Sequence, residues 1–303
     1  MQESLVPDQL NFYDLSLKDL KSHLKSLGKE QFRAQQIFKW VYEKKVTEFE
    51  AMSNISKGFR SELPRLLHFS LPKVTSHLIS QDGTQKFLFS GLANDTFEAV
   101  LIPSDDRLTL CVSSEVGCNM ACKFCLTGKQ KMTRKLNASE IVGQFIWAAK
   151  ALAEQAKGDS SKGTQSEGNQ HRISNIVFMG MGEPLDNPEN VFKAIEILTS
   201  DWGINLSKKR ITVSTSGIVP RMHLVADNKV RLAVSLNGVD NEIRSHLMPI
   251  NKKYPLEVLL KACREHYQRS KDKITFEYVL IRGVTDSLDD AKKLHKLTRS
   301  VPC

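Results

Sequence analysis

The sequence of 303 residues lacks the patterns that mark several large protein classes. It has no apolar run of membrane-spanning length, and its first residues do not form a signal-peptide pattern, so we expect a cytoplasmic protein without a membrane partner. ATP-binding loops, serine triads and zinc-hydrolase motifs are missing as well. Only six cysteines occur, unevenly spaced, which argues against a disulfide scaffold and favours a reducing compartment.

The charge balance is basic. A formal net charge of +9 and a pI near 9.2 suggest a polyanionic partner such as a nucleic acid. Because many basic proteins never bind RNA, charge alone supports this interpretation only weakly.

Half of the cysteines lie in one short run. Cys118, Cys122 and Cys125 form a CxxxCxxC pattern. Three thiolates on one loop can each hold one iron of a four-iron cubane, whereas an ordinary electron-transfer cluster takes four cysteines. The alternatives are a zinc half-site or a structural disulfide, but no second cysteine or histidine pair follows to close a zinc site. The pattern favours a cluster with one iron left open for a substrate or cofactor.

Residues 1–67 are predicted to form a helical accessory domain. Leu17, Leu20, Leu24 and Leu27 recur at helical spacing, and lysines and arginines lie on the other faces. Two interpretations remain open, a solvated helix surface and an RNA-docking module whose basic side chains bind phosphates.

Residues 68–104 are predicted to form an antiparallel β extension. A hairpin is expected over residues 77–89 with Asp82 and Gly83 in its turn, and a further strand over residues 96–103.

Residues 105–303 alternate between strand and helix patterns. About five such units in series indicate an α/β fold with a parallel sheet or barrel, whose functional loops follow the carboxyl ends of the strands. Residues 155–170, rich in Gly, Ser, Gln and Lys, are predicted to be a disordered surface insertion. The predicted strands cover residues 108–113, 173–179, 210–214, 231–236 and 274–281, and helices are predicted over residues 139–154 and 188–200.

Several dispersed motifs carry a family resemblance. They are the cysteine run with an aromatic before its last cysteine, LCVSSEVGC at 110–118, MGMGEP at 179–184, STSG at 214–217 and MPINKKY at 248–254. In this order they resemble the radical S-adenosylmethionine (AdoMet) superfamily, and within it the dual-specificity methyltransferases of adenine C2 in 23S rRNA and tRNA. The resemblance runs from about residue 15 to residue 303.

For the fold, the resemblance implies a partial (β/α)6-type radical AdoMet barrel, preceded by the helical domain and the β extension. The sixth strand of that barrel should begin near Val301. Because the sequence stops at Cys303, we expect a core that is truncated at the sixth strand.

For cofactors, the resemblance implies one 4Fe-4S cluster, held by the three cysteines of the CxxxCxxC run, and two molecules of AdoMet per turnover. Adenine C2 is electron-poor, so a radical route avoids the need to turn it into a nucleophile. The family more often has histidine at the last AdoMet-binding position, so a backbone contact is expected there. The implied AdoMet-binding residues are Gly182 and Glu183 at the methionine end, Ser214 at the ribose or carboxylate, and Ser235, Leu236 and Asn237 as a further contact.

Two residues are implied to act on the adenine. Glu98 matches the proton acceptor, and Cys111 matches a resolving thiol that frees the product through a transient disulfide. The family's methyl-accepting cysteine and an asparagine ligand for AdoMet have no counterpart in this sequence. Cys303 matches only a structural position, and Cys263 is expected in the core.

The implied partners are 23S rRNA, tRNA and a reducing donor such as flavodoxin, and we expect a monomer. Lys129, Lys131, Arg134 and Lys135, beside the cysteine run, are candidate RNA contacts. Two other functions remain open: methylation of adenine C8 in 23S rRNA, the antibiotic-resistance type, and a non-catalytic RNA-binding remnant.

Overall fold

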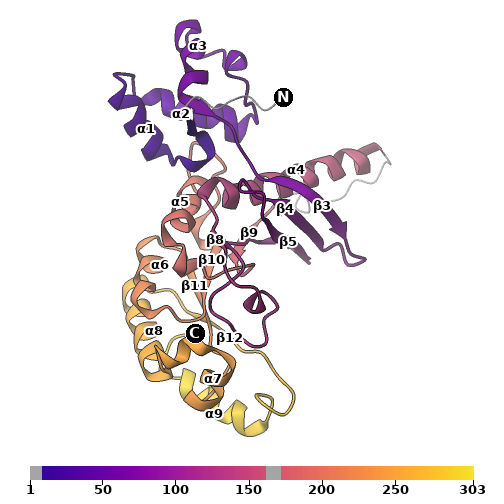
Figure 1. Ribbon diagram of the computed structural model, residues 1–303, viewed down its shortest axis with the longest axis vertical. Helices are drawn as coiled ribbons and strands as arrows, with labels where there is room; N and C mark the ends of the chain where they lie inside the picture. The colour runs from indigo at the N-terminus through magenta and orange to yellow at the C-terminus, as the bar shows by residue number, and fades with distance from the viewer. Residues whose placement is uncertain (1–8, 162–171) are drawn as a thin grey trace.

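Eight strands form one continuous sheet in the computed structural model, which describes residues 9–161 and 172–303. The order of the strands across the sheet is β12-β11-β10-β9-β6-β5-β4-β3 (Figure 1). The strands are β3 (Lys73–Ile79), β4 (Gln85–Ser90), β5 (Thr96–Ser104), β6 (Arg107–Cys111), β9 (Asn175–Phe178), β10 (Ile211–Thr215), β11 (Arg231–Ser235) and β12 (Thr275–Glu277).

One half of the sheet is parallel. Strands β6, β9, β10, β11 and β12 pair in parallel with their neighbours, which confirms the five predicted strand–helix units. The helices of this half are α4 (Ala138–Ser161), α5 (Pro188–Leu198), α6 (His223–Asp227), α7 (Asn241–Leu247), α8 (Leu256–Ser270) and α9 (Leu288–Thr298).

The last strand is shorter than predicted. β12 ends at Glu277, because the Val279 amide donates to the side chain of Asn237 at 2.9 Å instead of continuing a ladder. A sixth parallel strand is not formed within residues 172–303, although the Ile274 amide donates to the carbonyl of Pro302 at 3.1 Å beside β12. The prediction of a six-unit barrel that is truncated at its sixth strand therefore stays a prediction.

The other half of the sheet is antiparallel. β3 and β4 form the predicted hairpin around Asp82 and Gly83, and β5 follows where a strand was expected. β5 also pairs with β6, with Val100 opposite Cys111. The antiparallel extension and the parallel half therefore share one sheet.

The alternation of side chains gives this sheet two different faces. Phe97, Ala99 and Leu101 on β5, and Leu108 and Leu110 on β6, are all buried in the apolar core. The intervening residues point to the opposite face and are partly exposed at most positions. In Figure 1, helices α5, α6 and α8 run along one side of the parallel strands. The opposite side is where the candidate site lies.

The predicted disordered insertion is partly wrong. Helix α4 continues through the first residues of that segment and ends at Ser161, because Glu154, Gln155, Ala156 and Lys157 are all good helix formers. The Gln155 side chain also accepts a hydrogen bond of 3.0 Å from Gln85 on β4. Residues 162–170 of the predicted insertion lie outside the described residues.

The N-terminal segment is helical, as predicted. It contains α1 (Leu17–Ser26), α2 (Phe32–Phe38) and α3 (Lys57–Leu66), tied by the short parallel pair β1 (Leu10–Asn11) and β2 (Leu67–His68). Leu20 and Leu24 of the predicted stripe are fully buried, whereas Leu27 lies beyond the end of α1 and is exposed. The segment contacts α4, where the amide of Ser139 donates to Asp14 at 2.7 Å.

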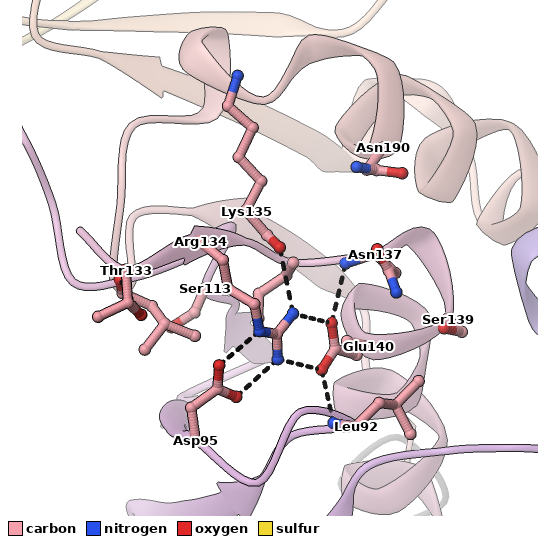
Figure 2. A network of polar contacts seen from close by, with 12 residues as sticks. Leu92, Asp95, Ser113, Thr133, Arg134, Lys135, Asn137, Ser139, Glu140 and Asn190 are labelled. Carbon is pink, nitrogen blue, oxygen red and sulfur yellow. Dashed lines mark hydrogen bonds and ion pairs between the residues drawn. The ribbon is translucent and has the colours of Figure 1, made fainter.

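Arg134 joins three distant segments (Figure 2). It lies on the short strand β8 (Arg134–Lys135), and its guanidinium donates to the carboxylates of Asp95 and Glu140. Glu140, on the first turn of α4, also accepts from the amides of Leu92 and Asn137, each at 2.9 Å. The carboxylate of Glu140 is fully buried and depends on these donors.

We predict that Arg134→Ala lowers the free energy of unfolding by about 3–5 kcal/mol, because it leaves a buried carboxylate without its cation. Urea denaturation followed by circular dichroism measures the change. Arg107→Ala is the matched control, since its pair with Asp106 is exposed and should contribute less than about 1 kcal/mol. Equal losses in the two variants would contradict the role given to Arg134.

Candidate cluster and AdoMet site

The three cysteines lie on one loop, residues 117–133, between β7 (Glu115–Val116) and β8. Gly117 begins the loop with φ of +79°, and a side chain there would place its Cβ 2.4 Å from the carbonyl oxygen of Lys131. The Cys118 amide donates to the carbonyl of Gln130 at 3.0 Å, which closes the loop on itself. This turn requires glycine next to the first cysteine.

The remaining cysteines are held on the same loop. The Cys125 amide donates to the carbonyl of Cys122 at 3.2 Å, and the Lys123 amide donates to the carbonyl of Leu247 at 2.9 Å. All three thiols are partly exposed. Burial raises the pKa of Cys118 to about 12 and that of Cys122 to about 11. A metal that binds them as thiolates must therefore displace protons.

The donor set fits an iron–sulfur cluster better than a single metal ion. In residues 9–161 and 172–303, no three His, Cys, Asp or Glu side chains converge as a single-ion site would require. The ligands of a cubane bind different irons, so three thiols spread along one loop suit a cluster. The zinc half-site stays an alternative, which metal analysis separates from the cluster.

The cysteines form no disulfide. All six are free thiols, so the disulfide expected of Cys111 is not present in this structure. Cys263 is fully buried, which confirms its predicted place in the core, and Cys303 is exposed.

The turn after β9 carries Gly182 and Glu183. Gly182 has φ of +97°, and a Cβ there would lie 2.5 Å from that of Glu115. Glu183 is buried, and its carboxylate accepts from the amide and hydroxyl of Ser216, at 2.7 and 2.8 Å, and from the amide of Leu185 at 3.1 Å. Both of its oxygens are therefore engaged within the protein.

Glu115 is a second buried carboxylate in this turn. One oxygen accepts from the Glu183 amide at 2.9 Å, and the other is buried without a hydrogen-bond partner. Burial raises the pKa of Glu183, and it raises the pKa of Glu115 to about 7. Sequence reasoning did not single out Glu115, although it stands three residues before Cys118.

Ser214 and Ser235 share a hydrogen-bond acceptor, the carboxylate of Glu277. The hydroxyl of Ser214 donates to Glu277 Oε2 at 3.1 Å, and that of Ser235 donates to the same oxygen at 3.2 Å. Ser235 and Glu277 end β11 and β12, and Ser214 is the next-to-last residue of β10. Sequence reasoning found the two serines but missed the carboxylate that joins them.

Leu236 and Asn237, next along the chain, are both buried. The amide of Leu236 donates to the carbonyl of Glu277 at 2.9 Å. The Asn237 side chain accepts from Val279 and lies 3.6 Å from the sulfur of Met248. These side chains are packed inside the protein, so the backbone is left for a ligand contact here, and that contact stays a prediction.

Arg244 on α7 donates hydrogen bonds to the backbone at the ends of the same strands. It is fully buried and donates to the carbonyls of Ser216 at 2.7 Å, Leu236 at 2.9 Å and Ser235 at 3.1 Å, and to Asn251 at 2.9 Å. Burial lowers its pKa to about 10, which leaves it charged at neutral pH. Its positive charge also interacts with the Cys122 thiol.

Cys111 and Glu98 share a face of the sheet. Val100 stands opposite Cys111, and Glu98 is two residues from Val100, so both point to the same side. Burial raises the pKa of the Cys111 thiol to about 11. The Glu98 side chain is 39% exposed and lies 2.7 Å from Lys86 Nζ, so it forms a solvated ion pair, and its role as proton acceptor stays a prediction.

The strand register places these groups on one face. Cys111 pairs with Val177, Val177 with Thr212, and Ser235 with Glu277. Side chains in register, or two residues apart on a strand, share a face. Glu98, Cys111, Ser214, Ser235 and Glu277 therefore line the side of the sheet away from the buried core.

Two of the four basic residues near the cysteine run have other partners. Arg134 is held by its two carboxylates, and the Lys135 ammonium donates to the carbonyl of Asp186. Lys129 and Lys131 are exposed. We therefore keep only Lys129 and Lys131 as candidate RNA contacts from this group.

Two family models match the chain. Residues 10–68 match the N-terminal domain of ribosomal RNA large subunit methyltransferases, and residues 165–295 match the radical SAM superfamily. A crystal structure of a radical SAM methyltransferase from Sphaerobacter thermophilus superposes with a TM-score of 0.84 at 38% identity, over 97% of this chain and 83% of that one. The fold and the cysteine-bearing loop thus define a protein of the radical SAM class.

Relatives narrow this class to one family. The dual-specificity RNA methyltransferase RlmN of Bdellovibrio bacteriovorus is 63% identical over 97% of this chain and 70% of its own length. That of Geotalea uraniireducens is 46% identical over 97% of this chain and 81% of its own length. The chain belongs to the RlmN family of dual-specificity RNA methyltransferases.

We predict that anaerobic reconstitution loads about four irons per chain, and that Ala in place of Cys118, Cys122 or Cys125 abolishes this, because each thiolate holds one iron. Iron and sulfide analysis with visible absorption measures the loading. Cys303→Ala is the matched control and should load normally, since this exposed thiol lies outside the loop. Zinc in the site, or unchanged iron in the three variants, would show the assignment to be wrong.

Proposed function

We propose that this protein methylates C2 of a specific adenine in 23S rRNA and in tRNA, with one 4Fe-4S cluster and two molecules of AdoMet per turnover. The observation that carries the proposal is the three-cysteine loop, joined through Glu115 to the turn after β9, in a chain of the RlmN family. When bound, the cluster and AdoMet supply a 5′-deoxyadenosyl radical. The protein supplies the binding groups and the thiol chemistry.

For AdoMet, the strand-end turns provide the contacts. The backbone at Gly182 and Glu183 binds the methionine end, while the Glu183 side chain holds the turn to Ser216. The ribose or the carboxylate of AdoMet contacts Ser214. A further contact is made by Ser235 and by the backbone at Leu236 and Asn237. Cys118, Cys122 and Cys125 hold the cluster.

For the adenine, Glu98 is the proton acceptor and Cys111 the resolving thiol. Glu98 lies 2.7 Å from Lys86 Nζ on the exposed face of β5, and a proton acceptor must be within hydrogen-bond reach of the proton that it removes. Because burial raises the pKa of Cys111, its thiol stays protonated until it acts in the release of the product. The donor such as flavodoxin, the monomeric state and the cytoplasmic location stay predictions.

RNA binding is assigned to the exposed lysines. Lys129 and Lys131 stand on the cluster loop, and the helical domain adds further exposed basic residues. Such side chains contribute phosphate affinity without base specificity. A target adenine must leave its stack to reach the polar face, as in other enzymes that modify bases. The described residues include no helix long and apolar enough to cross a membrane.

We predict that double substitution of Lys129 and Lys131 by Gln weakens the binding of structured RNA and flattens its dependence on salt, because two phosphate contacts no longer release counterions. Filter binding at several salt concentrations measures both quantities. The matched control replaces Lys292 and Lys296, two exposed lysines on α9, and should leave the salt slope unchanged. Equal slopes for all three proteins would contradict this surface.

We predict that the natural gene product containing these residues forms 2-methyladenosine in both RNAs, and that Cys111→Ala stops the release of product and leaves RNA covalently bound to protein. Liquid chromatography with mass spectrometry after a single turnover measures both species. Cys263→Ala, a core cysteine, should still release product. Detection of 8-methyladenosine instead would favour the C8 alternative, and efficient release by Cys111→Ala would remove the resolving role.

A further inference from the structure

A cavity of about 480 Å³ lies between the N-terminal helical domain and helix α4. Its walls include Tyr13 and Tyr42 of the domain and Phe145, Ile146 and Trp147 of α4. None of its described lining residues belongs to the cysteine loop or to the strand ends. Cavities of about 300–1,000 Å³ with mostly apolar walls and a few polar groups are typical of ligand sites.

The cavity is well separated from the cysteine loop. Helix α4 begins at Ala138, shortly after that loop and β8, whereas the cavity is lined by α4 residues between 145 and 157. With a rise of 1.5 Å per residue, Lys150 lies about 18 Å along the helix axis from Ala138. A ligand in this cavity is therefore a different group from the adenine that is methylated.

Tyr42 gives the cavity a polar group that lacks a partner. The residue is 8% exposed, and its hydroxyl is buried without a hydrogen-bond partner among the described residues. The ring packs against Phe12 and Phe38, with centroids 5.5 and 5.2 Å away. Burial raises the pKa of Tyr42, so the hydroxyl stays protonated at neutral pH. Since buried polar groups normally have partners, this hydroxyl points to a ligand with a polar edge.

Three lysines surround the same cavity. Lys45, Lys150 and Lys157 are all exposed, and none of them forms an ion pair with a described residue. Glu154 is the single carboxylate among the described lining residues. The cavity therefore has an excess of positive charge, which favours an anionic ligand.

The indole of Trp147 is fixed in the wall. Its Nε1 donates to the carbonyl of Pro72 at 2.7 Å, and Lys150 Nζ lies 4.8 Å from its ring centroid. The aromatic surface and one of the cations are thus positioned together before any ligand binds.

These groups match the parts of a nucleotide. Unpaired bases stack on aromatic side chains and form hydrogen bonds through their edges, and phosphates bind lysines. An acyl chain would use neither the Tyr42 hydroxyl nor the lysines. A base-paired duplex would keep its bases out of the cavity.

We propose that this cavity binds one unpaired nucleotide of the RNA substrate, with the base between the aromatic walls, its edge at Tyr42 and its phosphates at the lysines. The inference rests on the proposed function, because it assumes an RNA substrate. It adds a second nucleotide contact to the methylated adenine. RNA that offers both unpaired nucleotides at the right separation is bound more tightly than RNA that offers one.

Tyr42→Phe tests the proposal with little change in packing. Fluorescence anisotropy with a labelled tRNA transcript and cluster-loaded protein measures Kd, which should rise about 2- to 10-fold because one hydrogen bond is lost. The urea midpoint should not fall, since the hydroxyl has no partner in the protein to lose. Tyr267→Phe, a partly exposed tyrosine on α8, is the matched control and should leave both quantities unchanged.

The lysines are tested by a double variant, Lys150→Gln with Lys157→Gln. The slope of log Kd against log salt should fall by about 1.4, because each phosphate contact to a single strand contributes about 0.7. The double variant of Lys292 and Lys296 is again the control.

Ultraviolet cross-linking with mass spectrometry locates the base directly. The tRNA transcript should cross-link to peptides that contain Tyr42 or Trp147, and Tyr42→Phe should reduce the yield. A parallel reaction with adenosine 5′-monophosphate alone tests a free nucleotide as the occupant. Cross-links from the free nucleotide at these residues, with none from tRNA, would overturn the proposal.

The outcomes separate this inference from the proposed function. If the wild type forms 2-methyladenosine but Tyr42→Phe and the lysine variant both bind tRNA as the wild type does, the cavity assignment is overturned and the proposed function stands. If Tyr42→Phe loses affinity and stability together, Tyr42 acts through the fold and the assignment is overturned as well. If the wild type neither binds tRNA nor forms 2-methyladenosine, the proposed function fails, and this inference fails with it.

Discussion

A buried cation organises the ends of the strands. Arg244 is fully buried, and its guanidinium donates to backbone carbonyls at the ends of β10 and β11. Ser216 and Leu236 lie just beyond the ends of their strands, and a buried carbonyl that lacks a donor costs free energy. The same α7 helix receives the Lys123 amide of the cysteine loop through Leu247. One helix therefore ties the cluster loop to the strand ends.

The two buried carboxylates of the neighbouring turn complete this frame. Glu183 bridges the turn after β9 to Ser216 after β10, and Glu115 joins it to the start of the cysteine loop. Glycine is required at position 182 because the backbone passes directly over the Glu115 side chain. The Glu183 side chain, which the sequence suggested as a ligand contact, is therefore used for hydrogen bonds within the protein. The backbone of this turn and the hydroxyls of Ser214 and Ser235 are the groups that we propose to contact AdoMet.

Local patterns predicted much of the fold. Alternation over β5, the Asp82–Gly83 turn and the repeated strand–helix units all depend on neighbouring residues, so they can be read from one chain. The CxxxCxxC run is equally local. What could not be predicted depends on distant contacts: Ser214 meets Glu277 across 63 residues, and Arg134 meets Asp95 across 39. The shortening of β12 has the same origin, because Asn237 captures an amide that a strand would have used.

The central claim is that three cysteines hold a cluster whose fourth iron is open to AdoMet. Electron paramagnetic resonance of the reduced, cluster-loaded protein, recorded with and without saturating AdoMet, tests it most directly. If one iron lacks a protein ligand, AdoMet should change the spectrum of the cluster, because it alters the coordination of that iron. An identical spectrum in protein that calorimetry shows to be saturated with AdoMet would mean that the cofactor binds away from the cluster, and would contradict the account.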